Sequence, residues 1–207
     1  MALNQVRVGN TPGTASSGVG APVDMRAGNM NDIIMSQLHG RYYEAAYRRS
    51  LFVIANQAAV ATTEALTTTW TGLLVGNPTT NTANNLVLLG FGYAQTVVAS
   101  AATTIGIMTG TGATVTASLT PRNCYVGGAS TNALSNAGQT LPGTPVLERV
   151  FASVGTLATT GYGTQPMSYF PLDGSLILPA GAFVANYSTA ANTAAWLFFF
   201  LFEEVPA

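Results

Sequence analysis

The stretch AAWLFFFLFEEVPA, residues 194–207, decides the fold prediction. A bilayer-spanning helix needs about 20 apolar residues, whereas the apolar run at 196–202 is followed directly by two glutamates. The run therefore predicts a strand rather than a membrane anchor. Alternate residues of a half-exposed strand are polar, but here both alternating sets are large and apolar. The sets are Trp196, Phe198, Phe200 and Phe202, and Leu197, Phe199 and Leu201. We expect the chain's own core to cover one face and a neighbouring subunit to cover the other.

The chain has few charged side chains. They make up 7% of its 207 residues, none is a lysine, and the formal net charge is -1, whereas about a quarter of the residues in a typical soluble domain are charged. A surface so poor in charge repels its neighbours weakly and tends to associate. This favours a subunit of a large assembly over a free enzyme. The seven basic residues cannot neutralise many phosphates, so we expect no nucleic-acid partner.

Cysteine usage and the N-terminus indicate synthesis in a reducing cytoplasm. Cys124 is the single cysteine, so neither an intrachain disulfide nor a thiolate zinc site can form. The first residues, MALNQVRVGN, lack the apolar segment of a secretory signal. No other segment has the length and apolar character of a transmembrane helix, and we expect no membrane partner.

Residues 1–30 are rich in Gly, Ser, Thr and Pro and nearly free of large apolar side chains. Such a segment cannot bury enough surface to fold alone, and it is expected to be a flexible or extended N-terminal arm. Residues 31–207 are expected to form a single β-sandwich domain. At its start, 31–38 has the spacing of a short helix behind an Asn31 cap. The segment RYYEAAYRRSLFVIA, 41–55, alternates with the period of a strand, most clearly towards its end.

The remainder reads as short strands separated by Gly, Asn, Pro and Thr. The predicted strands are 52–55, 69–75, 85–93, 103–108, 114–119, 146–154, 175–178, 182–188 and 195–203. The segments 76–85, 109–112 and 127–145 have turn or loop composition, and PAG at 179–181 predicts a tight hairpin. Because no amphipathic helices separate the strands, we predict an all-β fold, a jelly-roll-like antiparallel β-sandwich.

Few residues could support catalysis. His39 is the single histidine, which excludes a metal site with two imidazole ligands. A Ser-His-Asp triad would have to use His39, in a chain with no GxSxG motif. Glu203 and Glu204 are consecutive and point to opposite faces of a strand, so they cannot act as a pair. We expect them to be solvated and to block edge-to-edge aggregation. We predict no enzyme activity, catalytic residue, metal or cofactor.

Two further groups of residues are candidate interaction sites. Arg41, Arg48 and Arg49 form the one basic cluster, diluted by Glu44, and indicate either a solvated face or an intersubunit ion pair. Aromatic side chains could form a glycan-binding platform, although aromatics at strand spacing more often lie in cores or interfaces. The candidates for that platform are Tyr42, Tyr43, Tyr47, Trp70, Tyr162 and Tyr169.

Three stretches carry a further pattern: HGRYYEAAYRRSLFVIANQA (39–58), TTTWTGLLVGNPTTNTANNLVLLGF (67–91) and GSLILPAGAFVANYSTAANTAAWLFFFLFEEVP (174–206). In the second, an apolar strand ends in L-x-x-NP before a polar loop and the strand NLVLL. In the third, a PAG hairpin precedes a last strand that closes on aromatic and acidic residues. In this order they resemble virion structural proteins of tailed bacteriophages. The chain departs from that group at NPTTNTANN, where a Gly-Lys is common.

The resemblance implies a phage head decoration (cement) protein with a jelly-roll-like fold, usually a trimer, bound to the major capsid protein or other virion proteins. Its expected location is the virion, after synthesis in the host cytoplasm. The residues expected to contact other copies or the capsid are Trp196, Phe198, Phe200, Phe202, Arg41, Arg48 and Arg49. The alternative is a tail, neck or fibre component that acts as a receptor- or glycan-binding module.

Overall fold

The computed structural model describes residues 40–64, 66–97, 99–112, 116–141, 143–155 and 168–207. The chain divides into two units, residues 1–43 and 44–207. The predicted arm (1–30) and the predicted helix at 31–38 lie outside the described residues. The described part contains the helix α1 (Tyr43–Tyr47) and the strands β1 (Leu51–Ala55), β2 (Val60–Thr62), β3 (Thr69–Gly76), β4 (Asn84–Gln95), β5 (Thr103–Thr111), β6 (Arg122–Asn123), β7 (Leu134–Thr140), β8 (Val146–Val154), β9 (Ser168–Leu178), β10 (Ala182–Ser188) and β11 (Asn192–Pro206).

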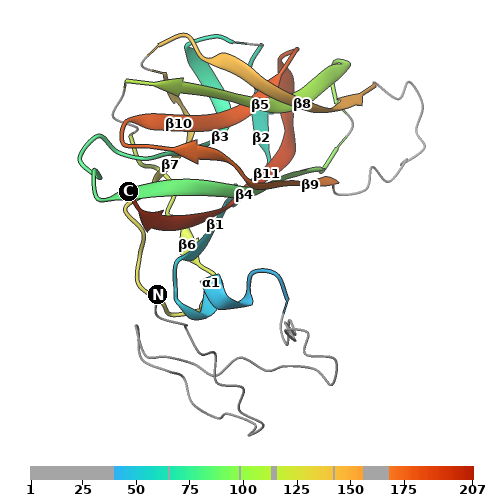
Figure 1. Cartoon of the computed structure of the whole chain (residues 1–207). Coiled ribbons are helices and arrows are strands. Elements are labelled where there is room, and N and C mark those ends of the chain that lie inside the picture. The colour runs from blue at the N-terminus through green and yellow to red at the C-terminus, as the bar shows by residue number, and fades with distance from the viewer. Residues whose placement is uncertain (1–39, 65, 98, 113–115, 142, 156–167) are drawn as a thin grey trace, which may run out of the picture. The chain divides into compact units, whose positions relative to one another are not determined.

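Residues 44–207 form a sandwich of two antiparallel sheets (Figure 1). The first, here called the β11 sheet, has the order β6-β1-β11-β4-β9, and β2 also pairs with β11. The second, the β10 sheet, has the order β7-β3-β10-β5-β8. Apart from β2, β6 and β7, the first strand pairs with the last (β1–β11) and the second with the second-last (β3–β10). The next two pairs, β4–β9 and β5–β8, follow the same order. This nesting is the topology of a jelly roll, and it confirms the predicted fold class.

The main core lies between the two sheets. Alternate β11 residues, from Trp196 to Phe202, point into it, where Phe91 of β4 packs at centroid distances of 6.0 Å from Phe198 and 5.1 Å from Phe200. The β10 sheet contributes Leu73, among other aliphatic side chains. Full burial of one large apolar side chain stabilises a fold by about 1.5–3 kcal/mol. This aromatic row is therefore the main attachment between the sheets.

β10 is the strand that the chain itself buries on both faces. All seven of its residues are buried. Val184 lies in the main core, whereas Phe183 and Tyr187 belong to a second cluster that includes Trp70 and Met108. For β11, by contrast, the chain fully buries only one of the two apolar sets.

Buried asparagine side chains form hydrogen bonds to backbone groups, a role that charged side chains fill in other proteins. Asn56 donates from Nδ2 to the carbonyl of Gly72 at 3.0 Å and accepts from the Phe198 amide at 3.1 Å, which ties β11 to β3. Asn77, fully buried, donates to the carbonyl of Leu178 at 3.0 Å. Amides satisfy buried backbone groups without the cost of desolvating an ion. They help to explain how a chain with so few charged residues holds its connections.

Several local predictions are corrected. Residues 116–118 are irregular and Leu119 forms an isolated bridge to Ser135, so the strand predicted at 114–119 is wrong in its described part. β7 lies within the predicted loop at 127–145, and β5 continues through the predicted turn at 109–111. Helix α1 occupies residues for which alternation predicted a strand, while β9 begins seven residues before the predicted start at 175.

The PAG segment is a corner rather than a hairpin. Gly181 has a φ of 82°, and the Ala182 amide donates to the Pro179 carbonyl at 3.0 Å, so the predicted tight turn is present. However, β9 pairs with β4, while β10 pairs with β3 and β5. The turn therefore carries the chain from one sheet to the other.

Candidate functional site

The four aromatic residues predicted as contact residues face inwards. Trp196, Phe198, Phe200 and Phe202 are each at most 1% exposed and belong to the main core. Strand alternation directs all four towards the β10 sheet. They have no surface to offer a partner, and the interface prediction for them is corrected.

The opposite set of β11 residues lies on the outside of the β11 sheet. Leu197, Phe199 and Leu201 are half-buried. The strand register places them in rows that cross the sheet, with neighbours on one face directly opposite each other. One row is Ala55, Phe199, Gly92 and Tyr169; the next is Val53, Leu201, Gly90 and Pro171; a third is Leu51, Glu203, Val87 and Ile177. Of these, Leu51 is itself buried. We call these rows, together with Leu197, the outer apolar face.

A flat aromatic pair lies within this face. The rings of Tyr169 and Phe199 stack with centroids 5.9 Å apart and an interplanar angle of 1°. Glycines make room for them: a Cβ on Gly90 would lie 2.4 Å from the Tyr169 ring, and a Cβ on Gly92 would lie 2.1 Å from the Phe199 ring. The rings therefore lie against the backbone, and the face is smooth.

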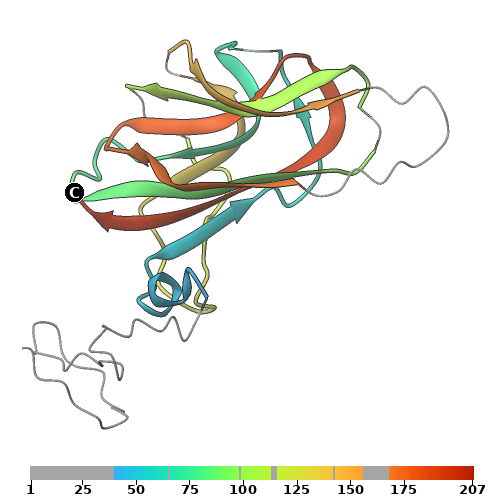
Figure 2. The same cartoon turned by 45° about the vertical axis from the view of Figure 1, so that its right-hand side comes forward.

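The outer apolar face carries almost no charge. Glu203 lies within it and accepts a hydrogen bond from Ser50 Oγ at 2.9 Å, and Arg122 on β6, opposite Val53, marks its margin. The outer faces of sandwiches are normally polar, yet Tyr169 is 41% and Ile177 53% exposed here. The β11 sheet, whose strands β4 and β11 run side by side in Figure 2, is the best candidate for an interaction surface.

The three arginines of the predicted basic cluster each contact a different nearby side chain. Arg48 pairs with Glu44 at 2.8 Å on the exposed surface of α1. Arg49 has a φ of 64°, and its guanidinium lies 4.8 Å from the Tyr125 ring centroid. Arg41, in the first unit, lies over the Tyr42 ring at 5.6 Å. The first pair is an exposed i,i+4 ion pair, worth a few tenths of a kcal/mol.

Glu204 is a hydrogen-bond hub rather than a solvated residue. Oε2 accepts from Thr131 Oγ1 at 2.6 Å, and Oε1 accepts from Nδ2 of Asn84 at 3.1 Å and of Asn132 at 3.2 Å. β11 is a central strand, between β1 and β4, so its glutamates protect no edge. The prediction of solvated, edge-blocking glutamates is corrected, because Glu204 joins the loop at Thr131 and Asn132 to the start of β4.

Glu204→Ala is expected to lower the free energy of unfolding by about 2–4 kcal/mol, because several donors lose a charged acceptor at once. Glu204→Gln should recover only part of the lost stability, since its amide NH2 group replaces one accepting oxygen and would face other hydrogen-bond donors. Glu203→Ala is the matched control and should cost about 1 kcal/mol or less, because one bond from Ser50 is lost. Urea unfolding measures all three; equal costs at positions 203 and 204 would refute the hub.

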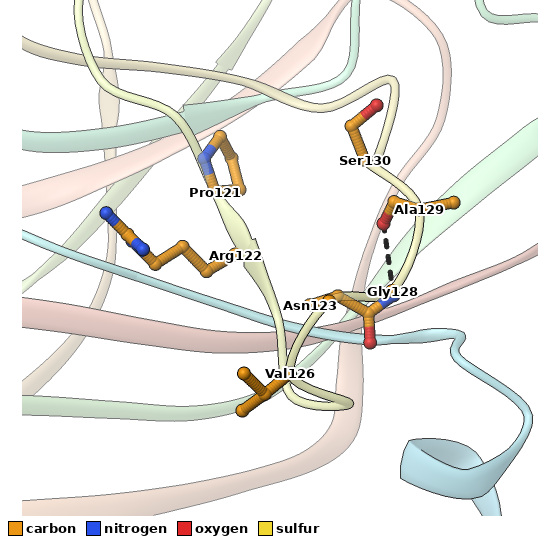
Figure 3. Close-up of a pocket in the computed structure, with 8 residues that line it drawn as sticks. Pro121, Arg122, Asn123, Val126, Gly128, Ala129 and Ser130 are labelled. Carbon is orange, nitrogen blue, oxygen red and sulfur yellow. Dashed lines mark hydrogen bonds between the residues drawn. The ribbon is translucent and has the colours of Figure 1, made fainter.

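Shallow cavities are also present on the surface. One, of about 310 Å³, lies along the edge strands and is lined in part by Val146 of β8 and Ile177 of β9. Figure 3 shows another, about 290 Å³, in the segment from Pro121 to Ser130, where Asn123 Nδ2 donates to the Ala129 carbonyl at 3.2 Å. These linings offer no described nucleophile paired with a base. In the described ranges, no group of three His, Cys, Asp or Glu side chains could hold a metal.

The other candidate residues are dispersed. Trp70 is buried and donates from Nε1 to the Asn186 carbonyl at 3.1 Å, so it belongs to the second cluster rather than to a platform. Tyr47 is 62% exposed on α1, whereas Tyr162 and His39 lie outside the described residues. Burial raises the pKa of the Cys124 thiol above its ordinary value. Among the described glycan-platform candidates of residues 44–207, Tyr169 lies on the outer apolar face.

Sequence reasoning missed the outer apolar face, including the residues that β9 contributes. A signal for the form of this face exists in β4. In LGFGY, 89–93, glycine alternates with an aromatic residue. This pattern indicates a strand with one bulky face and one face open to close approach.

No helix in the described ranges combines the length and the apolar character needed to cross a bilayer. No known protein family, curated protein or solved structure matches the chain. The fold and the outer apolar face are therefore the features from which a function can be inferred.

Proposed function

We propose that this chain is a non-enzymatic structural subunit of a virion, of the decoration (cement) type that binds and stabilises the head of a tailed bacteriophage. The observation that carries the proposal is the outer apolar face, a sheet surface with one charged residue, Glu203, within it and another, Arg122, at its margin, on a chain that is itself poor in charge. Exposed apolar surfaces of this extent mark sites of protein association.

The jelly roll is compatible with this role. It is used by viral capsid proteins, and also by lectins and cupins, so the fold by itself permits several functions. The resemblance of the three sequence stretches to virion proteins favours the first of these. Homo-oligomers, with a trimer favoured from the resemblance, and contacts with the major capsid protein are part of the proposal.

Decoration would act by mass action. A subunit that binds the assembled shell, and not its separate parts, favours the intact particle. At a free concentration 100 times the dissociation constant, one such site stabilises the bound state by about 2.7 kcal/mol. Repeated over a lattice, this effect needs no chemistry from the subunit, only a surface and enough copies.

A tail, neck or fibre component that binds a receptor or glycan is the second candidate. The specific observation in its favour is Tyr169, whose exposed ring lies flat on the β11 sheet. Flat aromatic rings are suited to packing against the apolar faces of sugars.

Co-sedimentation distinguishes the two candidates. The purified chain is mixed, at moderate salt, with heads assembled without it from the phage that encodes it and, separately, with tails. The decoration role predicts saturable binding to heads at a fixed number of copies per lattice unit. Binding to tails alone would favour the second candidate, and binding to neither would overturn the virion role.

A further inference from the structure

We infer that the outer apolar face is the surface through which copies of this chain contact one another. This inference deepens the proposed function. It rests on that function only in taking the chain to be an assembly subunit. Which particle the subunit joins does not enter the argument from the residues.

The size of the face suits a second copy. Four strands about 4.8 Å apart, over about 20 Å of length, present a footprint on the order of 400 Å², and protruding side chains make the accessible area larger. A specific interface buries about 800 Å² per partner at standard size, and weaker ones bury less. A single helix, about 10 Å wide, would cover about half the width, and a single strand, about 5 Å wide, about a quarter. A sheet of matching width is therefore a better occupant than one short segment.

The composition of the face also fits a contact between copies. Most side chains in its three rows are apolar, and the centres of interfaces are depleted of charge and enriched in aromatics. Its two charged residues, Glu203 and Arg122 at the margin, have opposite signs, so two copies of the face bring no net charge together. Tyr169 and Phe199 are pre-stacked, and rigid aromatic anchors tend to contribute most of the binding energy.

The edge strands β8 and β9 are poorly suited to the same purpose. β8 shifts register against β5 at two places. In β9, Asp173 and Gly174 have φ values of 52° and 76°, and Pro171 has no amide hydrogen to donate. Irregular edges of this kind resist pairing with another strand. The copies would therefore meet through sheet faces, and the number of copies is left for the mass measurement to decide.

The experiment is sedimentation velocity on the full chain from 1 to 100 µM. Wild type is expected to be an oligomer that dissociates at the low end. Leu201→Lys, in the middle row, should raise the dissociation constant at least 100-fold, and Ile177→Lys, in an exposed position, about 10-fold. Val150→Lys is the matched control, because Val150 is 51% exposed on β8 of the β10 sheet, and it should change nothing. Circular dichroism melting shows which variants remain folded.

A monomeric wild type at 100 µM would overturn the inference, and the face would then be covered by another part of the same chain or by a different partner. Unchanged oligomers in folded Leu201→Lys and Ile177→Lys would also overturn it. Should Leu201→Lys fail to fold, Ile177→Lys decides. No phage particle is used, so an intact oligomer that fails to bind heads would count against the virion role alone.

Discussion

Phe200→Ala is expected to lower the free energy of unfolding by about 3–5 kcal/mol, the range for truncating a buried phenylalanine. Phe200 is fully buried, lies opposite Ile54 of β1, and has its ring 5.1 Å from that of Phe91. Its neighbour Phe199 points to the other side of the same strand, where it is half-buried and stacks on Tyr169. Phe199→Ala should therefore cost about 1 kcal/mol in the isolated subunit.

These two variants separate the faces of β11. Both are compared by urea unfolding at the lowest practical protein concentration, so that association adds nothing to the measured stability. At concentrations where wild type is oligomeric, Phe199→Ala should have the larger effect on association. Equal losses of stability at positions 199 and 200 would show that the two faces had been assigned incorrectly.

Gly72→Ala is the second large effect, with an expected cost of about 3–5 kcal/mol. Gly72 lies at a register shift in β3 and has a φ of 141°, which strains any side chain-bearing residue. A Cβ there would lie 1.8 Å from Asn186 Oδ1, the atom that accepts the Leu73 amide at 2.6 Å. The variant combines backbone strain with the loss of a buried hydrogen bond.

Gly143→Ala is the control for this prediction. A Cβ at Gly143 has no atom within 4 Å, so the change should leave stability within about 0.5 kcal/mol of wild type. Thermal and urea unfolding report the difference. A Gly72→Ala protein as stable as Gly143→Ala would mean that β3 does not bulge at this position.

The sequence predicted the fold class because most strands are marked by their own residues. β8 and β10 begin and end at the predicted residues, since their apolar runs end in turn-forming residues. β7 was missed because LSNAGQT has little strand preference. It is held by pairing with β3 and by Ser135, whose hydroxyl donates to the Leu74 carbonyl at 2.6 Å. Such contacts are invisible in a local pattern.

The candidate site was only partly predictable. Two apolar sets on the last strand correctly indicated an unusual strand, but alternation alone cannot say which set faces the core. The choice depends on β4, where Phe91 and Tyr93 face inwards and Gly90 and Gly92 face outwards. It therefore depends on a pairing between strands about 100 residues apart along the chain. Tyr169 and Ile177 lie on the same face because β9 in turn pairs with β4.

The position of β11 between β1 and β4 has a consequence for the making of the protein. Ser50 and Glu203, which meet beside the β1–β11 pair, are 153 positions apart. β1 and β4 each expose an unpaired edge until β11 has been made and inserts between them. Loops this long close slowly, and waiting strands are prone to aggregate. Completion of the β11 sheet therefore waits for β11, and a chain whose β11 has not yet inserted exposes two strand edges that favour aggregation.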